Sequence, residues 1–243
     1  MDSTGASQTS AETALSVGWI GLGSMGLAMA MNVQKHLKAT GAPSLHYWNR
    51  TISKGKELGE LGGIACEHAA DVPRQCDITF ISLSDDKTLT HIANSIATLG
   101  PSLSGKILVD TTTVHPSTTT AISTQLSALG ASYIGAPVFG STPVAAAGQV
   151  LIAIAGPEPA LSTIAPLLRG VIARGVLRAG PDPAQALLLK TTSNMLTAGL
   201  TYLVAEAHTL AEKSGLPASV LEDLIEQNLG RGRGAPEQLG ARD

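Results

Sequence analysis

Short apolar runs alternate with longer amphipathic segments along most of the chain, and no other feature restricts its fold as much. Seven runs are predicted to be strands: Val17–Ile20, Leu45–Trp48, Ile78–Leu83, Ile107–Asp110, Tyr133–Val138, Leu151–Ala155 and Val171–Val176. Helices are predicted at Leu27–Lys38, Ser53–Leu61, Asp85–Leu99, from Pro116 onward and at Pro159–Leu168. Because repeated strand–helix units build a parallel sheet covered on both faces, we expect an α/β, doubly wound domain over residues 17–181.

The pattern changes after this domain, where the strand signal ends. A long helix is predicted at Ala184–Lys213 and a second helix at Ala218–Asn228, so residues 182–229 are expected to form a partial, all-helical C-terminal domain. Residues 1–16 are mostly small, hydroxylated or acidic and are predicted to be a disordered leader. Residues 230–243 are rich in glycine and are predicted to be a flexible tail.

Composition limits the class of protein. The chain of 243 residues is 44% hydrophobic and 14% charged, with a net charge of −3, so we expect a packed core and no nucleic-acid or anionic-membrane surface. The two cysteines, Cys66 and Cys76, lack metal-ligand spacing and are interpreted as small buried residues, so no metal site is expected. No run reaches the ~18 apolar residues of a membrane span, and no basic residue precedes Lys35, which favours a cytoplasmic location.

A glycine-rich turn follows the first predicted strand and precedes the first predicted helix. Its residues are Gly21, Leu22, Gly23, Ser24, Met25 and Gly26. In this G-x-G-x-x-G pattern, Gly21 permits a tight turn, Gly23 lets a pyrophosphate approach the backbone, and Gly26 lets the helix pack on the sheet. The helix N-terminus then faces the phosphates. The turn therefore predicts dinucleotide binding, with a purely structural glycine turn as the alternative.

The end of the second predicted strand bears on the choice of cofactor. An acidic residue at this position would bind the ribose 2′-hydroxyl of NAD, but the chain has Asn49, followed by Arg50 and Thr51. A guanidinium suits a 2′-phosphate because it is a planar, bidentate donor. NADP is therefore the favoured cofactor, with NAD as the alternative and a solvated turn arginine as the structural interpretation of Arg50.

The segment Gly-Trp-Ile-Gly-Leu-Gly-Ser-Met-Gly at residues 18–26 resembles the start of the β-hydroxyacid dehydrogenase family, which includes 3-hydroxyisobutyrate dehydrogenase and, more distantly, 6-phosphogluconate dehydrogenase. Four segments match this family in order, over residues 17 to about 229. The resemblance implies a Rossmann-type NADP-binding domain and a dehydrogenase or reductase acting on a small-molecule substrate. It also implies a homodimer or higher oligomer that forms through the helical C-terminal part.

Two further segments follow predicted strands. Leu83 and Ser84 match the family's turn beneath the nicotinamide ribose, with Ser84 in place of proline. The segment from Asp110 to Pro116 resembles the family's Asp-x-Ser-Thr-x-x-Pro, which implies that Thr112 contacts the substrate and Thr113 the cofactor. Helix capping alone is the structural alternative for Ser84 and for Thr113.

The fourth segment departs from the family where it would bind a substrate carboxylate. The chain keeps Ala-Pro-Val and Gly140 but has Phe139 for the family's serine and Ser141 for its second glycine. The resemblance assigns Phe139, Gly140 and Ser141 to the substrate site. The bulky ring suggests a substrate that is larger, flatter or less acidic than a small hydroxyacid.

Lys190 is the candidate proton donor. It follows three leucines in a predicted helix, and desolvation by such neighbours lowers a lysine pKa and favours proton transfer. Asn194 lies four residues later, on the same helix face. Both match the family's catalytic Lys-x-x-Asn-Asn pattern, although Ser193 replaces its first asparagine. A lysine whose ammonium extends to solvent is the structural alternative.

Together these features predict an NADP-dependent oxidoreductase that moves a hydride between nicotinamide and a 3-hydroxyacid- or semialdehyde-like substrate, with lysine as general acid/base. The alternative is a truncated, catalytically impaired protein that binds NADP or a partner. Family members continue further at the C-terminus, so the long helix is expected to expose an apolar stripe. Its members are Leu196, Leu200, Leu203 and Leu210.

Overall fold

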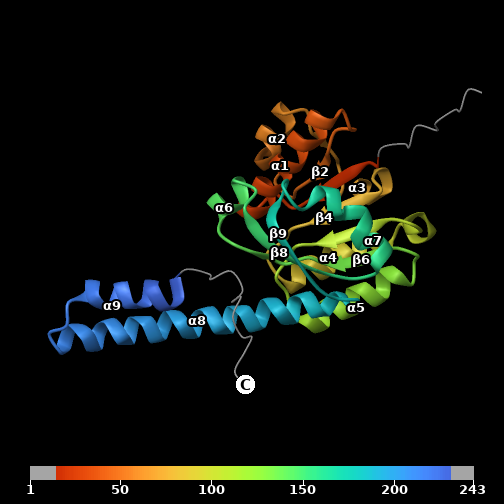
Figure 1. The fold of residues 1–243 in the computed structure, drawn as a ribbon. Coiled ribbons are helices and arrows are strands. Elements are labelled where there is room, and N and C mark those ends of the chain that lie inside the picture. Colours follow the sequence, from red (N-terminus) through yellow and green to blue (C-terminus); the bar gives the residue numbers. More distant parts are fainter. Residues whose placement is uncertain (1–14, 231–243) are drawn as a thin grey trace, which may run out of the picture. The chain divides into compact units, whose positions relative to one another are not determined.

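A computed structural model describes residues 15–230 (Figure 1). The chain divides into two compact units, one ending at Thr191 and the other beginning at Thr192. The sequence placed this boundary after residue 181. The difference arises because the first turns of helix α8 (Pro183–Lys213) pack on the sheet, where Ala186 and Leu187 are fully buried in the core.

The first unit is built on a mixed nine-stranded sheet. Its strands are β1 (Val17–Ile20), β2 (His46–Trp48), β3 (Ile64–Ala65), β4 (Ile78–Ile81), β5 (Ile107–Asp110), β6 (Ser132–Gly135), β7 (Val138–Phe139), β8 (Val150–Ala155) and β9 (Ala173–Gly180). The order is β3-β2-β1-β4-β5-β6-β8-β7, with β9 paired to β8. The pairs from β3 to β6 are parallel, as predicted. In contrast, β8 runs antiparallel to β6 and β7.

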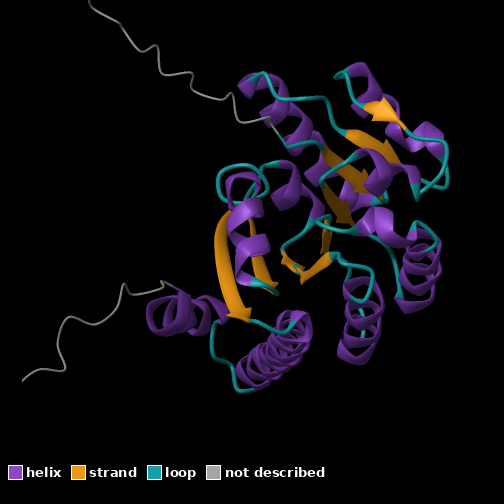
Figure 2. Ribbon diagram, turned by 90° about the vertical axis from the view of Figure 1, so that its right-hand side faces the viewer, coloured by secondary structure: helices purple, strands orange, loops and turns teal. Residues whose placement is uncertain are grey.

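Helices cover both faces of this sheet (Figure 2). They are α1 (Ser24–Thr40), α2 (Lys56–Glu60), α3 (Asp71–Gln75), α4 (Asp86–Ala97), α5 (Pro116–Ser127), α6 (Thr142–Ala146) and α7 (Glu158–Ile164). In β1, Trp19 joins the core beneath α1 and α7, whereas Ile20 joins the core beneath α4 and α5, because successive strand side chains point to opposite faces. The α/β, doubly wound prediction is therefore confirmed.

Helix α4 illustrates why these segments fold as predicted. Asp85 precedes it, and its carboxylate accepts a hydrogen bond of 2.8 Å from the amide of Thr88, which caps the helix. Leu89, Ile92 and Ile96 follow at helical spacing and are buried against the sheet. The cap and the apolar face together specify the start and the orientation of the helix.

Several boundaries differ from the prediction. Helix α1 begins at Ser24 rather than Leu27, so the second half of the glycine turn is already helical. The predicted strand Tyr133–Val138 is two strands: β6 ends at Gly135, and Pro137, which has no amide hydrogen to donate, lies between β6 and β7. The short elements β3, α3 and α6 were not predicted, since two to five residues are too few to show a period.

The ordered chain includes Ser16, which the sequence assigned to the leader. The Ser16 hydroxyl donates a hydrogen bond of 2.7 Å to the carboxylate of Asp77, and its amide donates another to the same oxygen at 3.0 Å. These contacts anchor the chain immediately before β1. Leu15 is described as well, whereas residues 1–14 of the predicted leader and 231–243 of the predicted tail lie outside the described residues.

The second unit contains the rest of α8 and α9 (Ala218–Ile225), followed by one wider helical turn at Glu226–Gly230. Ser214 and Gly215 separate the two helices, and Gly215 adopts a φ of 74°. The two predicted helices are present, and α9 buries no side chain. Within residues 15–230, no helix is long and apolar enough to cross a membrane.

Candidate functional site

The carboxyl ends of neighbouring parallel strands meet at one edge of the sheet. Strands β1, β4, β5 and β6 lie side by side in this order, so the segments that follow them are adjacent. Ligands of open α/β sheets bind outside this edge. The predicted cofactor and substrate residues Gly21, Leu83, Thr113 and Phe139 all follow these strands, and the topology therefore brings their segments together.

The glycine turn has the geometry that its three glycines predict. Gly21 adopts a φ of 96°, and a Cβ there would lie 2.1 Å from the carbonyl oxygen of Ser82. A Cβ on Gly26 would lie 2.2 Å from the Gly21 carbonyl, so the helix can approach the turn only without a side chain. By contrast, a Cβ on Gly23 would meet nothing within 4 Å.

The N-terminus of α1 is open to an anion. Gly23 is its N-cap, no side chain caps the helix, and the first turn holds no acidic residue. Gly23 and Ser24 are exposed, whereas the Leu22 side chain is buried in the core, so Leu22 can contribute only its backbone. Free amides and a helix dipole at an open surface suit a pyrophosphate.

Asn49 holds the glycine turn in place. Its carboxamide Oδ1 accepts a hydrogen bond of 2.9 Å from the Leu22 amide, and its Nδ2 donates one of 2.8 Å to the Thr51 carbonyl. The neighbouring Arg50 is exposed and has no hydrogen bond or ion pair within the described part of the chain. Arg50 is therefore a free cation beside the glycine turn.

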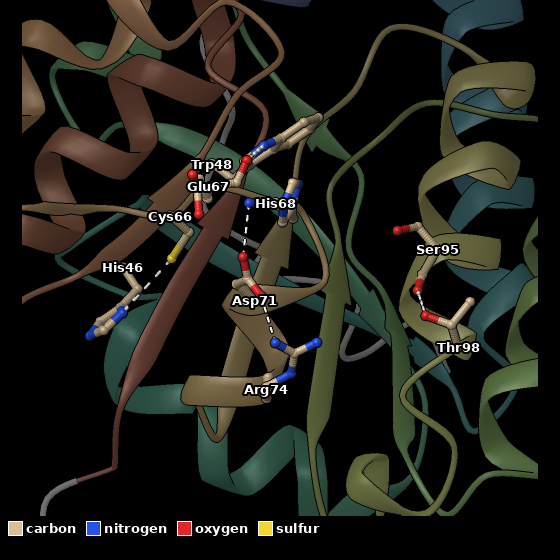
Figure 3. Close-up of polar contacts among 9 residues, drawn as sticks. All are labelled: His46, Trp48, Cys66, Glu67, His68, Asp71, Arg74, Ser95 and Thr98. Carbon is tan, nitrogen blue, oxygen red and sulfur yellow. Dashed lines mark hydrogen bonds and ion pairs between the residues drawn. The ribbon is translucent and has the colours of Figure 1, made fainter.

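A hydrogen bond from Trp48 and an ion pair hold the segment that follows β3 (Figure 3). The Trp48 Nε1 donates to the Glu67 carbonyl at 3.2 Å, and Arg74 forms an ion pair of 2.8 Å with Asp71. The Arg74 guanidinium is therefore already paired with a carboxylate, whereas Arg50 has no such partner among the described residues. The Sγ of Cys66 lies 3.9 Å from His46 Nδ1.

Both cysteines are buried, as predicted. Burial raises the pKa of the Cys76 thiol to about 12, which makes it an unreactive core residue. Among residues 15–230, no group of His, Cys, Asp or Glu side chains could hold a metal ion.

The segments after β4 and β5 are fastened to each other. The Thr112 hydroxyl accepts a hydrogen bond of 3.1 Å from the Leu83 amide, and Thr112 is only 2% exposed. This bond joins the two segments, and the expected contact of Thr112 with the substrate stays a prediction. Thr113 is exposed at the same edge. Ser84 is exposed too and donates to Asp85, which lowers the pKa of that carboxyl; Asp85, not Ser84, caps α4.

Asp110 is a buried acid that the sequence reasoning did not single out. Its carboxylate accepts hydrogen bonds of 2.9 Å from the Thr112 amide and 2.9 Å from the Tyr133 hydroxyl. Burial raises its pKa to about 6, although both hydrogen bonds act in the opposite direction. An acidic residue ending an otherwise apolar strand was the available signal. Asp110 fixes the start of the segment that carries Thr113.

The segment after β6 returns toward the glycine turn. Phe139 ends β7 and is half-buried, while Gly140 and Ser141 are exposed. Gly140 adopts a φ of 149°, which a residue with a side chain rarely adopts. The hydroxyl of Thr142 lies 3.7 Å from the Met25 Sδ, so this segment contacts the turn that would hold the pyrophosphate.

Lys190 lies in the first unit, and its ammonium is held by the protein. The Nζ donates a hydrogen bond of 2.8 Å to the Val138 carbonyl and lies 4.6 Å from the centroid of the Phe139 ring. The side chain is half-buried, and burial lowers its pKa. Asn194 follows one turn later on α8, at an exposed position of the second unit.

The two chemically distinct ends of the site lie on the same sheet edge. The open glycine turn follows β1, whereas the Lys190 ammonium is bonded to the segment that follows β6. Three strand spacings of ~4.8 Å separate β1 from β6, or roughly 14 Å. An extended dinucleotide can span this distance, with its pyrophosphate at the turn and its nicotinamide toward the lysine.

Known proteins resemble the chain over most of its length. The family model for the NAD binding domain of 6-phosphogluconate dehydrogenase matches residues 16–180. Glyoxylate/succinic semialdehyde reductase 1 of Arabidopsis thaliana is 32% identical over 214 residues, which cover 87% of this chain and 71% of that protein. The chloroplastic reductase 2 of the same plant is 32% identical over 215 residues, which cover 88% of this chain but only 58% of that protein.

A solved structure shares the fold. The Mycobacterium tuberculosis 3-hydroxyisobutyrate dehydrogenase, solved with L-serine, superimposes with a TM-score of 0.81 and 22% sequence identity. The match covers 90% of this chain and 72% of that one. At this identity the similarity shows the fold alone.

Proposed function

The chain belongs to the β-hydroxyacid dehydrogenase family of NAD(P)-dependent oxidoreductases, and from that premise we propose that it transfers a hydride between NADP and a 3-hydroxyacid- or semialdehyde-like substrate, with Lys190 as the general acid/base. One observation carries the proposal. The Lys190 ammonium is half-buried and bonded to Val138 at the sheet edge that also bears the open glycine turn. Carbonyl reduction requires a proton donor and a binding site for the dinucleotide, and the proposal assigns both to this edge of the sheet.

The residues at the glycine turn fit the cofactor. The turn offers uncapped amides of α1 and an open surface at Gly23, which suit the pyrophosphate. Arg50 is exposed and unpaired among the described residues, and we assign it to the 2′-phosphate of NADP. When bound, the nicotinamide ring supplies or accepts the hydride. Leu83, Ser84 and Thr113 are assigned to the nicotinamide half because they follow the central strands.

Lys190 would supply the proton. As the hydride reaches the carbonyl carbon, negative charge develops on the oxygen, and an ammonium nearby both stabilises this charge and donates a proton to it. Burial lowers the lysine pKa, which brings proton transfer closer to neutral pH. We assign Gly140 and Ser141 to substrate orientation and Asn194 to positioning Lys190 or the substrate hydroxyl. We assign Thr112 to the substrate side, with its hydroxyl held by the hydrogen bond from the Leu83 amide.

The decisive experiment compares Lys190→Ala with the parent protein and with Lys213→Ala, a control at an exposed position in the last turn of the same helix. Binding is measured by fluorescence titration of NADPH, and turnover by NADPH consumption over a panel of aldehydes and semialdehydes. We expect Lys190→Ala to bind NADPH normally and to lose roughly 10²- to 10⁴-fold in kcat. Full activity of Lys190→Ala would contradict the assigned role.

The departures at Phe139 and Ser193 favour a second candidate function, a protein of this family that binds NADP but does not turn over. The same experiment separates the two. If the folded parent protein binds NADPH tightly but turns over no carbonyl in the panel, the second candidate function, NADP binding without turnover, is favoured.

We also propose that the second unit associates with a second copy of the chain. Exposed apolar side chains are concentrated on its helices, among them Met195, Leu196, Leu203 and Leu210, each more than half exposed. An apolar surface of this kind is costly in water and is typical of an interface. The oligomeric state is measurable by light scattering. The cytoplasmic location stays a prediction, to be tested by cell fractionation.

A further inference from the structure

Two consecutive residues of one short strand hold the Lys190 ammonium. The Val138 carbonyl accepts its hydrogen bond at 2.8 Å, and the ring of Phe139 lies beneath it at 4.6 Å from the centroid. Strand β7 is itself fixed by antiparallel pairing to β8, with Val138 opposite Ile152 and Phe139 opposite Leu151. The ammonium is therefore held by a carbonyl and a π face whose positions the sheet determines.

Among the described residues of the first unit, no carboxylate pairs with the Lys190 ammonium. Strands β7 and β8 contain no charged residue, and Lys190 is the only charged residue in the part of α8 that belongs to the unit. Burial lowers the Lys190 pKa, and no charged group contributes to this shift. In the described residues the charge is thus stabilised by two neutral groups, because Lys190 takes part in no ion pair there.

We propose that Phe139 is a positioning residue, whose ring face holds the Lys190 ammonium at the Val138 carbonyl and favours its charged form. This inference rests on the proposed function, because it assigns Phe139 a part in the proton transfer that Lys190 would perform. The residue is a departure from the serine that the family pattern has here, so the contact is a property of this chain.

The hydrogen bond to Val138 and the contact with the Phe139 ring have different effects on the ammonium. A hydrogen bond to a carbonyl fixes where the nitrogen lies, and it requires a hydrogen on that nitrogen. The negative face of an aromatic ring attracts a cation but not a neutral amine, so the ring opposes the effect of burial on the proton affinity. Leucine fills a similar apolar volume without a π face. Phe139→Leu therefore removes the attraction while it keeps most of the desolvation.

The direct test is the pKa of Lys190 measured by NMR on protein with isotope-labelled lysine, with the signal assigned by its loss in Lys190→Arg. We expect Phe139→Leu to lower this pKa by roughly half a unit and Phe139→Tyr to keep it near the parent value. Phe139→Trp, whose ring attracts cations more strongly, should raise it. The signals of the other lysines, including the ion-paired Lys106, serve as internal controls for folding.

An unchanged Lys190 pKa in Phe139→Leu and Phe139→Trp, with the other lysine signals preserved, would overturn the inference. Opposite shifts in these two variants cannot come from a general loss of structure, because unfolding would move both toward the value of an exposed lysine. This comparison keeps the inference testable even where one variant is less stable.

A kinetic measurement separates this inference from the proposed function. In carbonyl reduction, the alkaline limb of the kcat/KM profile, which reports the free enzyme, should move to lower pH in Phe139→Leu by the same amount as the NMR pKa, with KM for NADPH unchanged. If the NMR shift occurs but no carbonyl is turned over by the parent, the proposed function fails and the positioning role stands. If turnover occurs and neither the pKa nor the alkaline limb moves, the positioning role fails alone.

Discussion

The Asn49 carboxamide accepts a hydrogen bond of 2.9 Å from the Leu22 amide and so joins the segment after β2 to the glycine turn after β1. One side chain thereby sets the distance between the site proposed for the pyrophosphate and Arg50, proposed for the 2′-phosphate. Replacing Asn49 with alanine removes the acceptor and leaves the Leu22 amide without its partner. We expect NADPH and NADH to bind about 10-fold more weakly, and to a similar extent, because the shared turn is loosened. Isothermal titration with NADPH and with NADH measures both affinities. A loss of affinity confined to NADPH would contradict the role of Asn49 in holding the glycine turn.

Arg50 is expected to discriminate between the cofactors. Arg50→Ala removes a free guanidinium, so NADPH binding should weaken by roughly 10-fold or more while NADH binding stays the same, since only NADPH carries the 2′-phosphate. Arg74→Ala is the matched control, because Arg74 is already paired with Asp71. The effect should also shrink at high salt, as expected for an exposed charge. Equal weakening of both cofactors would remove the phosphate assignment.

The glycines of the turn predict a contrasting pair of variants. A Cβ on Gly23 meets no atom within 4 Å, and its φ of −69° suits alanine, so Gly23→Ala should fold with a Tm close to the parent value. It should nevertheless lose dinucleotide binding, because the methyl group occupies the surface assigned to the pyrophosphate. Gly26→Ala, with a Cβ 2.2 Å from a carbonyl, should instead lose about 1–3 kcal/mol of stability. Thermal unfolding and NADPH titration distinguish them; a stable Gly23→Ala that binds NADPH normally would contradict the assignment.

Asp110 predicts a measurable pH dependence of stability. Its pKa is raised to about 6 in the folded protein, whereas an unfolded aspartate titrates near ~3.9. Between these values the folded state binds the proton more tightly, so the contribution of Asp110 to stability is largest at low pH and falls as pH rises toward 6. Relative to Asp110→Asn, the parent should lose up to about 3 kcal/mol between pH 4 and 7. Urea unfolding at several pH values measures the difference, and a difference that is constant with pH would show an unshifted carboxyl.

The exposed apolar residues of the second unit predict a change of oligomeric state. If a second copy covers them, the parent should elute as a dimer or larger, and Leu203→Glu should shift the equilibrium toward the monomer, because a charge cannot be buried without a partner. Glu206→Gln, an exposed position on the same helix, is the control. Multi-angle light scattering over a range of concentrations measures the mass. A monomeric parent at all concentrations would refute the interface.

Much of the fold and of the family assignment could be predicted from the sequence. The strand–helix alternation predicted the parallel half of the sheet, and the glycine spacing located a turn in which Gly21 and Gly26 make close approaches while Gly23 is open. The resemblance to the β-hydroxyacid dehydrogenase family is confirmed by the match over residues 16–180. These features are local, or depend on a fixed spacing, and a sequence displays them directly.

The partners of polar side chains could not be predicted in the same way. The sequence identified Thr112 as a hydroxyl near the site, but only the packing of two adjacent segments shows that it bonds to the Leu83 amide and is buried. From the sequence, Asn49 was interpreted only as a position without a carboxylate. Its hydrogen bond with the Leu22 amide, 27 positions away, could not be predicted. The antiparallel pairing of β8 likewise depends on the chain reversing between Phe139 and Val150, which periodicity does not reveal.

Strand β7 has only two residues, and side chains alternate between the faces of a sheet. If β7 slipped by one residue along β8, its side chains would exchange faces, and the benzyl group of Phe139 would leave Lys190 and point into the opposite layer. With Lys190 as the proposed proton donor, replacements of Leu151 or Ile152 that loosen this pairing would reduce proton transfer without unfolding the protein. The position of the ammonium would then depend on the pairing of β7 with β8 as well as on the lysine itself.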